Sequence, residues 1–157
     1  MTTTSAQSES IDTAYALLAE GERLIAAGQY REGSASVYQA AFTALQAVAE
    51  RRSWVCETEQ DVGDIIHRLD GVEPLPDDAA EAIKVAFERV DDPLPVFSTL
   101  LVNVDCFKLH SATVFRDGVS LPVYFWEPED YVKSLPLVKK FIDLLRSELH
   151  NTVDHDP

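Results

Sequence analysis

The 157-residue chain is poor in cysteine and in basic residues, and each scarcity excludes a class of protein. Cys56 and Cys106 have no metal-ligand spacing to further cysteines, and a chain of this length can form a core without disulfides, so we expect free thiols. Lys and Arg number 13 against 27 Asp and Glu, which gives a net charge of −14. Because Lys and Arg provide the affinity for nucleic-acid phosphates, broad nucleic-acid binding is not expected.

Long hydrophobic runs are also missing. No apolar stretch approaches the roughly 20 residues that cross a bilayer, and residues 1–10 lack the basic start and apolar centre of a signal peptide. We therefore expect a cytoplasmic protein with no membrane contact. The sequence contains no Gly-rich phosphate loop, nucleophile elbow or zincin motif. It therefore predicts no cofactor, no metal and no catalytic residue.

Helical periodicity dominates the remaining pattern and is clearest in residues 12–52. A first helix is predicted to begin at Ile11 or Asp12 and to end at Gly28, since glycine readily adopts the left-handed angles found past a helix end. A second helix, residues 31–52, follows after a connection so short that the two helices must run antiparallel. The first helix places small and apolar residues on one face: Ala14, Leu17, Leu18, Gly21, Leu24 and Ile25. Gly33, Ser34 and Ala40 predict close packing of the second.

Four further helices are predicted. The third ends before Gly71, and the others cover residues 79–90, 94–115 and 127–150, with a kink or restart at Pro136. Residues 119–126 are predicted to form an extended aromatic lid, and no strand-rich region is expected. The predicted fold class is all-α, an antiparallel up-and-down bundle of five or six helices. A single domain is predicted over residues 12–150, with disordered ends at 1–11 and 151–157.

Three stretches share a pattern with a known superfamily. Gly28 and Tyr30 precede a long helix with the paired alanines Ala40 and Ala41, residues 109–115 contain a Leu-His followed by an aromatic, and residues 127–148 form an acid-opened amphipathic helix. In these stretches the chain resembles the HEPN-like superfamily (higher eukaryotes and prokaryotes nucleotide-binding), specifically its archaeal repeat-associated paralogous proteins of unknown role. The resemblance implies a helical binding domain. Tetratricopeptide-like helix pairs have a similar first hairpin.

The superfamily's ribonucleases resemble one another in an Arg followed by a His a few residues later. An Arg can hold a phosphate, and a His can move a proton near neutral pH. His67 and His110 have no Arg at the required positions. Arg146 and His150 come closest, with three intervening residues. We interpret the nuclease site as absent.

A candidate ligand site lies near the end of the fifth predicted helix. Lys108, His110 and Arg116 can form a small anion site, with Tyr124 and Trp126 of the aromatic lid placed to stack on a nucleotide-like ligand. The alternative is structural, because cations near a helix C-terminus also interact favourably with the helix dipole. The aromatic residues can equally fill the end of the bundle or seal a dimer.

Cys106 and His110 share a helix face with Asn103, a spacing that suits a metal or an activated thiolate. Since no third ligand of matching spacing is present, packing in the core is the favoured interpretation.

We therefore predict a non-catalytic HEPN-like binding module, a regulator or adaptor of a protein partner or a nucleotide-like ligand. A homodimer is expected, through the second helix or the aromatic lid. One alternative is a ribonuclease toxin with a degenerate motif, and another is a helical-repeat-like scaffold. A third is an acidic nucleic-acid mimic using residues 57–92, where twelve acidic residues accompany three basic ones.

Overall fold

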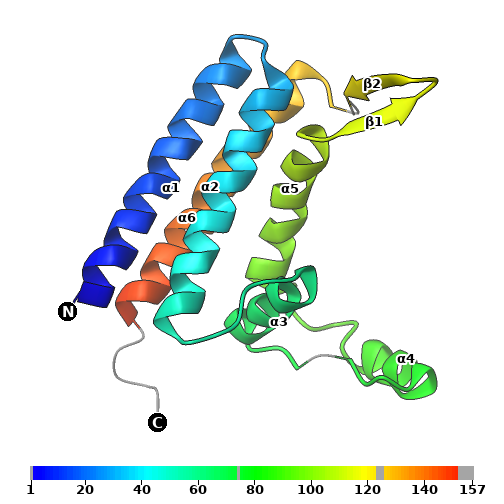
Figure 1. Cartoon of the computed structure of the whole chain (residues 1–157). Coiled ribbons are helices and arrows are strands. Elements are labelled where there is room, and N and C mark those ends of the chain that lie inside the picture. Colours follow the sequence, from blue (N-terminus) through cyan, green and yellow to red (C-terminus); the bar gives the residue numbers. More distant parts are fainter. Residues whose placement is uncertain (1, 74, 123–125, 152–157) are drawn as a thin grey trace. The chain divides into compact units, whose positions relative to one another are not determined.

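The computed structural model describes residues 2–73, 75–122 and 126–151. Within these ranges the side chains of residues 2–4, 113–116, 120–122 and 151 are not described. The described chain is an all-α helical bundle of six helices with one short two-stranded hairpin, which confirms the predicted fold class (Figure 1). None of the described helices has the length and apolar content that crossing a membrane requires.

Contacts within the chain define two compact units. The first comprises Met1–Val55 together with Leu100–Pro157, and the second comprises Cys56–Thr99. Each unit is described below on its own. The single domain over residues 12–150 and the disordered tail stay predictions, and residues 152–157 of that tail lie outside the described ranges.

Helices α1 (Thr2–Ala26) and α2 (Tyr30–Arg51) form the predicted antiparallel hairpin. Gly28 lies between them with φ 81°, and the amide of Gln29 donates to the carbonyl of Leu24 at 2.9 Å, so the end of α1 is closed by a left-handed glycine. The buried residues of α1 recur at alternating four- and three-residue intervals, a spacing that keeps one seam against a neighbouring helix: Gln7, Ile11, Ala14, Leu18, Gly21 and Ile25.

The start of α1 differs from the prediction. The helix begins at Thr2, and not at Ile11 or Asp12, so residues 2–11 are helical where the sequence predicted disorder. Gln7 and Ile11 extend the buried seam of α1 toward its N-terminus and are 3% and 4% exposed. Tertiary packing therefore accounts for a helical start that the local Ser/Thr/Gln composition does not favour.

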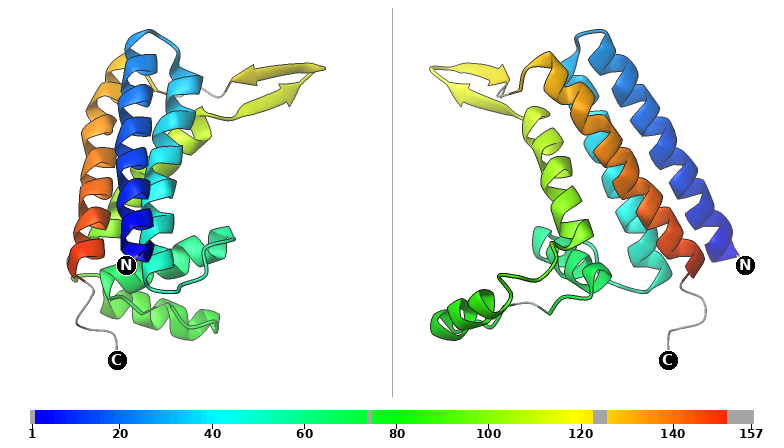
Figure 2. Two further views of the ribbon diagram at one scale, coloured as in Figure 1. Left: turned by 60° about the vertical axis from the view of Figure 1, so that its left-hand side comes forward. Right: turned by 180° about the vertical axis from the view of Figure 1, so that it is seen from behind.

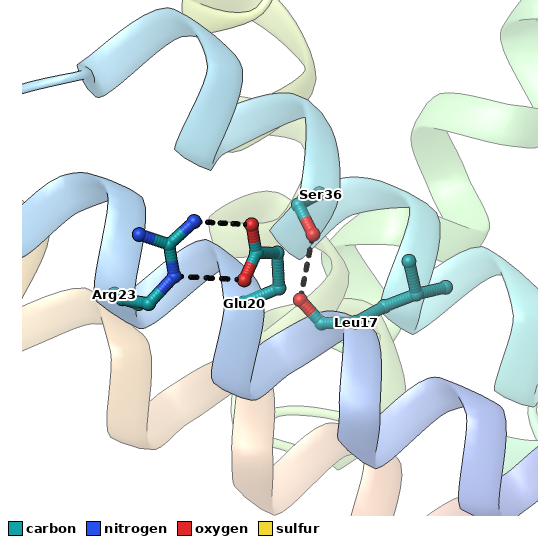
Figure 3. Close-up of polar contacts among 4 residues, drawn as sticks. All are labelled: Leu17, Glu20, Arg23 and Ser36. Carbon is teal, nitrogen blue, oxygen red and sulfur yellow. Dashed lines mark hydrogen bonds and ion pairs between the residues drawn. The ribbon is translucent and has the colours of Figure 1, made fainter.

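Polar contacts also hold this hairpin. The hydroxyl of Ser36 on α2 donates to the carbonyl oxygen of Leu17 on α1 at 2.7 Å, which joins the two helices directly (Figure 3). On α1, Arg23 forms two hydrogen bonds to the carboxylate of Glu20, at 2.6 and 2.9 Å. Because both partners of this pair are exposed, it contributes little to stability.

Helix α6 (Pro128–Asn151) packs against α2 and α1, and the three helices run side by side with α2 and α6 in the same direction (Figures 1 and 2). Its buried residues follow a helical stripe: Tyr131, Ser134, Val138, Phe141, Ile142 and Leu145. Helix α6 continues through Pro136, so the predicted restart is not seen. Proline removes the hydrogen bond to the carbonyl of Val132, and that residue is exposed, which allows water to replace the lost donor.

The fifth predicted helix is shorter than expected. Helix α5 (Val96–His110) ends before Thr113–Arg116, which forms strand β1 and pairs antiparallel with β2 (Val119–Pro122). The prediction that this helix continues to residue 115 is therefore wrong, and the strands of the described chain are limited to this one hairpin. Asp117 and Gly118 form the turn of this hairpin, and both have positive φ (53° and 79°), as a tight hairpin turn requires. Residues 123–125 of the predicted lid lie outside the described ranges.

The second unit contains α3 (Glu59–Asp70) and α4 (Ala79–Glu88). Thr58 and Asp61 form a capping box at the start of α3, and Ile65 and Ile66 are buried. Helix α4 begins after Asp78, whose carboxylate accepts from the amide of Glu81 at 3.0 Å.

Candidate functional site

The predicted site residues His110 and Trp126 belong to an aromatic cluster in the first unit. The His110 ring stacks on Trp126 with 4.5 Å between centroids, and Tyr131 of α6 packs edge-on against both. Phe107, one turn before His110, meets Trp126 edge-to-face at 5.1 Å, and Tyr30 at the start of α2 stacks on Tyr131 at 4.6 Å. These contacts join α2, α5 and α6 through apolar ring faces, which is what a packed core requires.

His110 is fully buried within this cluster. Its Nδ1 lies 2.8 Å from the carbonyl oxygen of Cys106, one turn earlier on α5. Because a carbonyl oxygen only accepts, Nδ1 must carry the proton and donate it. Burial lowers the pKa of His110, although the hydrogen bond to Cys106 opposes that shift. Burial therefore favours a neutral imidazole with a packing role, in contrast to the cation of an anion site.

The other predicted site residues are placed differently. The ammonium of Lys108 lies over the ring of Tyr38, 5.6 Å from its centroid, in a cation–π contact. Arg116 belongs to β1, but its side chain is not described, and Tyr124 lies outside the described ranges. The structure thus brings His110 and Trp126 together. The anion site made by Lys108, His110 and Arg116 stays a prediction.

The suggested Cys106–His110 pairing takes a different form in the structure. The imidazole contacts the backbone carbonyl of Cys106. Burial raises the pKa of the Cys106 thiol, and the neighbouring Asp105 carboxylate raises it further, so the thiol is not activated. The Oδ1 of Asn103 is buried without a hydrogen-bond partner among the described residues. Over the same ranges, no three His, Cys, Asp or Glu side chains are grouped as metal ligands.

A cavity lies at the other end of the hairpin. It is formed where the N-terminal part of α1 meets the last turns of α2 and α6, an arrangement that follows from α2 and α6 running in the same direction (Figure 2). Its volume is about 180 Å³. The lining residues come from three helices: Gln7, Ser8, Ile11, Asp12, Arg51, Arg146, Leu149 and His150.

Basic residues gather around this cavity although the chain is strongly acidic. Arg51, Arg146 and His150 line it, against the single lining carboxylate of Asp12. The neighbouring Arg52 is paired with Glu148 at 3.5 Å. Arg51 and Arg146, in contrast, form no ion pair with any described residue. The cavity is therefore lined by two arginines without an ion pair among the described residues, and guanidinium groups bind oxyanions through paired donors.

The position of Arg146 is held by Tyr15 of α1. Its guanidinium lies over the Tyr15 ring, 5.3 Å from the centroid. The Tyr15 hydroxyl donates in turn to the carboxylate of Asp143, one turn earlier on α6. Burial raises the pKa of Tyr15 to about 12, with the hydrogen bond and charge of Asp143 adding to the shift. The phenol therefore stays neutral and keeps the ring in place beneath Arg146.

Gln7 adds a buried amide to the cavity wall. The side chain is 3% exposed, and its Nε2 has no hydrogen-bond partner among the described residues. An unsatisfied buried donor costs roughly 1–3 kcal/mol, and such groups in folded proteins call for an explanation. A ligand oxygen would be one possible partner for this carboxamide, since Gln7 lines the cavity.

Sequence reasoning singled out Arg146 and His150 but missed Gln7 and Arg51. Arg146 and His150 are four residues apart and therefore lie on the same face of α6, and both line the cavity. Arg51 is the basic residue in the last turn of α2, a position that the helix dipole explains equally well. Gln7 carried no signal, because it lies in the segment predicted to be disordered.

Comparison of the sequence with known proteins does not identify a family: no family model matches it, and no curated protein is significantly similar. The functional argument accordingly depends on the geometry of the cavity and on the chemistry of its residues.

Proposed function

We propose that this chain is a non-catalytic binding module that takes a small anionic ligand in the cavity lined by Arg51, Arg146 and His150. The supporting observation is that two arginines without an ion pair among the described residues, and a buried amide, line one cavity of a chain whose net charge is −14. A site that gathers positive charge against the overall charge of its protein attracts anions locally. The resemblance to the HEPN-like superfamily agrees with a binding role, but the proposal depends on the cavity.

The size of the cavity indicates the class of ligand. Pockets for drug-sized molecules measure roughly 300–1,000 Å³, and this cavity measures about 180 Å³. It therefore suits a phosphate or carboxylate group, as a free anion or as the charged end of a nucleotide-like ligand. Arginine binds both groups through two parallel N–H···O bonds, which also define the orientation of the ligand.

Thermal unfolding of the purified chain in inorganic phosphate, compared with chloride at equal ionic strength, tests the proposal. Phosphate is expected to raise the Tm, because a ligand that binds only the folded state stabilises it. Arg146→Ala should lose that rise, and Arg146→Lys should keep part of it, since a lysine preserves the charge but not the paired donors. Arg146 is exposed, so neither change disturbs the core.

Arg23→Ala is the matched control. Arg23 is an exposed arginine of α1 that pairs with Glu20 and does not line the cavity. Its loss should leave the phosphate response intact. Equal responses in Arg23→Ala and Arg146→Ala, or no response in the unaltered chain, would contradict the proposal.

Incubation of the same samples with single-stranded RNA separates binding from catalysis. We expect no cleavage, because Arg146 and His150 depart from the spacing of the superfamily's ribonucleases. Cleavage that disappears in both Arg146→Ala and His150→Ala, but not in Arg23→Ala, would establish the ribonuclease alternative in place of the binding module.

We further propose that the chain is a cytoplasmic homodimer and acts as a regulator or adaptor of a protein partner. Helix α2 already buries ten of its residues, so a dimer through α2 would have to use its remaining face. Light scattering measures the mass of the particle in solution, and a monomer would remove the homodimer from the proposal.

A further inference from the structure

Helix α4, in the second unit, leaves its large apolar side chains exposed. None of its ten residues is buried, and Ile83 and Phe87, four residues apart on one face, are 59% and 74% exposed. Exposed apolar residues continue on either side of the helix. We call these exposed residues the α4 surface: Leu75, Ile83, Phe87, Val90, Leu94 and Val96. Single exposed apolar residues are ordinary, but six within residues 75–96 indicate an interaction surface.

The helix itself has too few contacts to account for its stability. Isolated helices of this length are marginal in water, and helices in proteins depend on packing of an apolar face. In α4 only Ala82 and Val85 reach half-burial. A partner that covers Ile83 and Phe87 would provide the packing that α4 lacks. This reasoning concerns residues 56–99 and goes beyond the function proposed for the cavity.

Acidic side chains are frequent in the same segment of the chain. Six carboxylates lie within residues 77–92, against the basic Lys84 and Arg89. Arg89 donates to the carbonyl oxygen of Glu73 at 2.8 Å, and Asp78 caps α4. The other five carboxylates form no ion pair with any described residue: Asp77, Glu81, Glu88, Asp91 and Asp92. They are available to a partner of opposite charge.

We propose that the α4 surface docks a basic amphipathic helical segment of another protein. Its apolar side chains would cover Ile83 and Phe87, and its Lys and Arg would face the surrounding carboxylates. Complementary charge selects the partner and speeds association, while the apolar contacts provide the affinity. A second copy of this chain is a poor occupant, because it would bring the same carboxylates and a net charge of −14 to the interface. An anionic membrane is repelled for the same reason.

The test uses a labelled synthetic helical peptide with Leu on one face and Lys and Arg on the other. Fluorescence anisotropy during titration with the full chain should show binding that weakens as salt is added. Phe87→Gln should weaken binding roughly tenfold or more, as expected of an apolar anchor. Glu88→Lys should weaken it and also reduce its salt dependence. Both residues are exposed, so circular dichroism should show unchanged folding.

Matched controls distinguish this surface from general attraction to an acidic protein. Val132→Gln removes an exposed apolar residue of α6, and Glu22→Lys reverses an exposed charge of α1. Each should change affinity by no more than about twofold. A peptide carrying Glu in place of its basic residues should not bind.

Three results would overturn the proposal. One is failure of the basic peptide to bind, and another is an equal loss in Phe87→Gln and Val132→Gln. The third is a dimer, detected by light scattering, that Phe87→Gln dissociates. That last result would assign the α4 surface to a second copy of the chain.

Discussion

Gly21 of α1 and Gly33 of α2 face each other backbone to backbone. A Cβ atom placed on either glycine would lie 2.9 Å from the carbonyl oxygen of the other. This reciprocal contact allows α1 and α2 to approach closely and brings Val37 and Ile25 against the opposing helix. The small residues of α2 therefore serve packing, as the sequence predicted.

Gly33→Ala is expected to destabilise the hairpin. Its new methyl group would meet backbone atoms of α1 that cannot move independently, and overpacking of this kind costs about 1–3 kcal/mol. The gain in helix propensity, about 1 kcal/mol, offsets only part of that cost. Urea denaturation followed by circular dichroism measures the net change.

Gly63→Ala is the matched control. Gly63 lies inside α3, and a Cβ atom there would have no neighbour within 4 Å. This substitution should raise the free energy of unfolding by about 0.5–1 kcal/mol through helix propensity alone. Equal effects at the two glycines would contradict the close approach of α1 and α2.

Tyr15 is expected to make stability fall at alkaline pH. The pKa of its phenol is raised from 10.0 to about 12 in the folded chain. The protonated form is therefore favoured by folding, and its contribution is complete below pH 10 and is lost as pH rises from 10 to about 12. Tyr15→Phe should reduce stability at neutral pH by about 1 kcal/mol and remove this part of the alkaline decline.

Tyr38→Phe is the control for Tyr15, since the Tyr38 hydroxyl makes no hydrogen bond with any described residue. Thermal unfolding of Tyr38→Phe between pH 8 and pH 12 should show the same alkaline decline in stability as the unaltered chain. If Tyr38→Phe loses the alkaline decline in stability and Tyr15→Phe keeps it, the decline comes from Tyr38 and the prediction is wrong.

His110 is expected to lower stability at acidic pH. Burial depresses its pKa in the folded chain below the ordinary 6.5, so folding favours the neutral ring. Its contribution is present above pH 6.5 and is lost as pH falls through the folded pKa. Long-range ¹H–¹⁵N NMR should show a titration below pH 6.5 with the proton on Nδ1. A titration above 6.5, or a proton on Nε2 alone, would contradict the buried geometry.

Asp70 is expected to stabilise the first turn of α5. Its carboxylate accepts from the amide of Phe97 at 2.8 Å and from the amide and hydroxyl of Ser98 at 2.9 and 2.6 Å. Asp70→Ala leaves these helix-start donors without acceptors, which costs about 1–2 kcal/mol. Hydrogen exchange of the Phe97 and Ser98 amides should accelerate.

Asp91→Ala is the control for Asp70, because Asp91 is exposed and its side chain makes no hydrogen bond with any described residue. Exchange at Phe97 and Ser98 should then match the unaltered chain. Similar acceleration in both variants would show that loss of negative charge, and not loss of the cap, is responsible.

Local chemistry made much of the helical framework predictable. Gly28 and Gly71 adopt the left-handed angles that end α1 and α3, and Asp78 caps α4, each as its residue type indicates. The pairing of residues 113–116 with 119–122 was not predictable in the same way, because the apolar residues before the turn fit a continuation of the helix as well as a strand.

The sequence by itself determined the acidic character of the chain, its helical class and most helix boundaries, because these depend on composition and on residues a few positions apart. Only the tertiary structure decided what the side chains face. It buried His110 against Trp126, and it joined Gln7, Arg51 and Arg146 from three helices in one cavity. Such groupings depend on the direction and packing of whole helices, which bring together residues that no spacing along the chain relates.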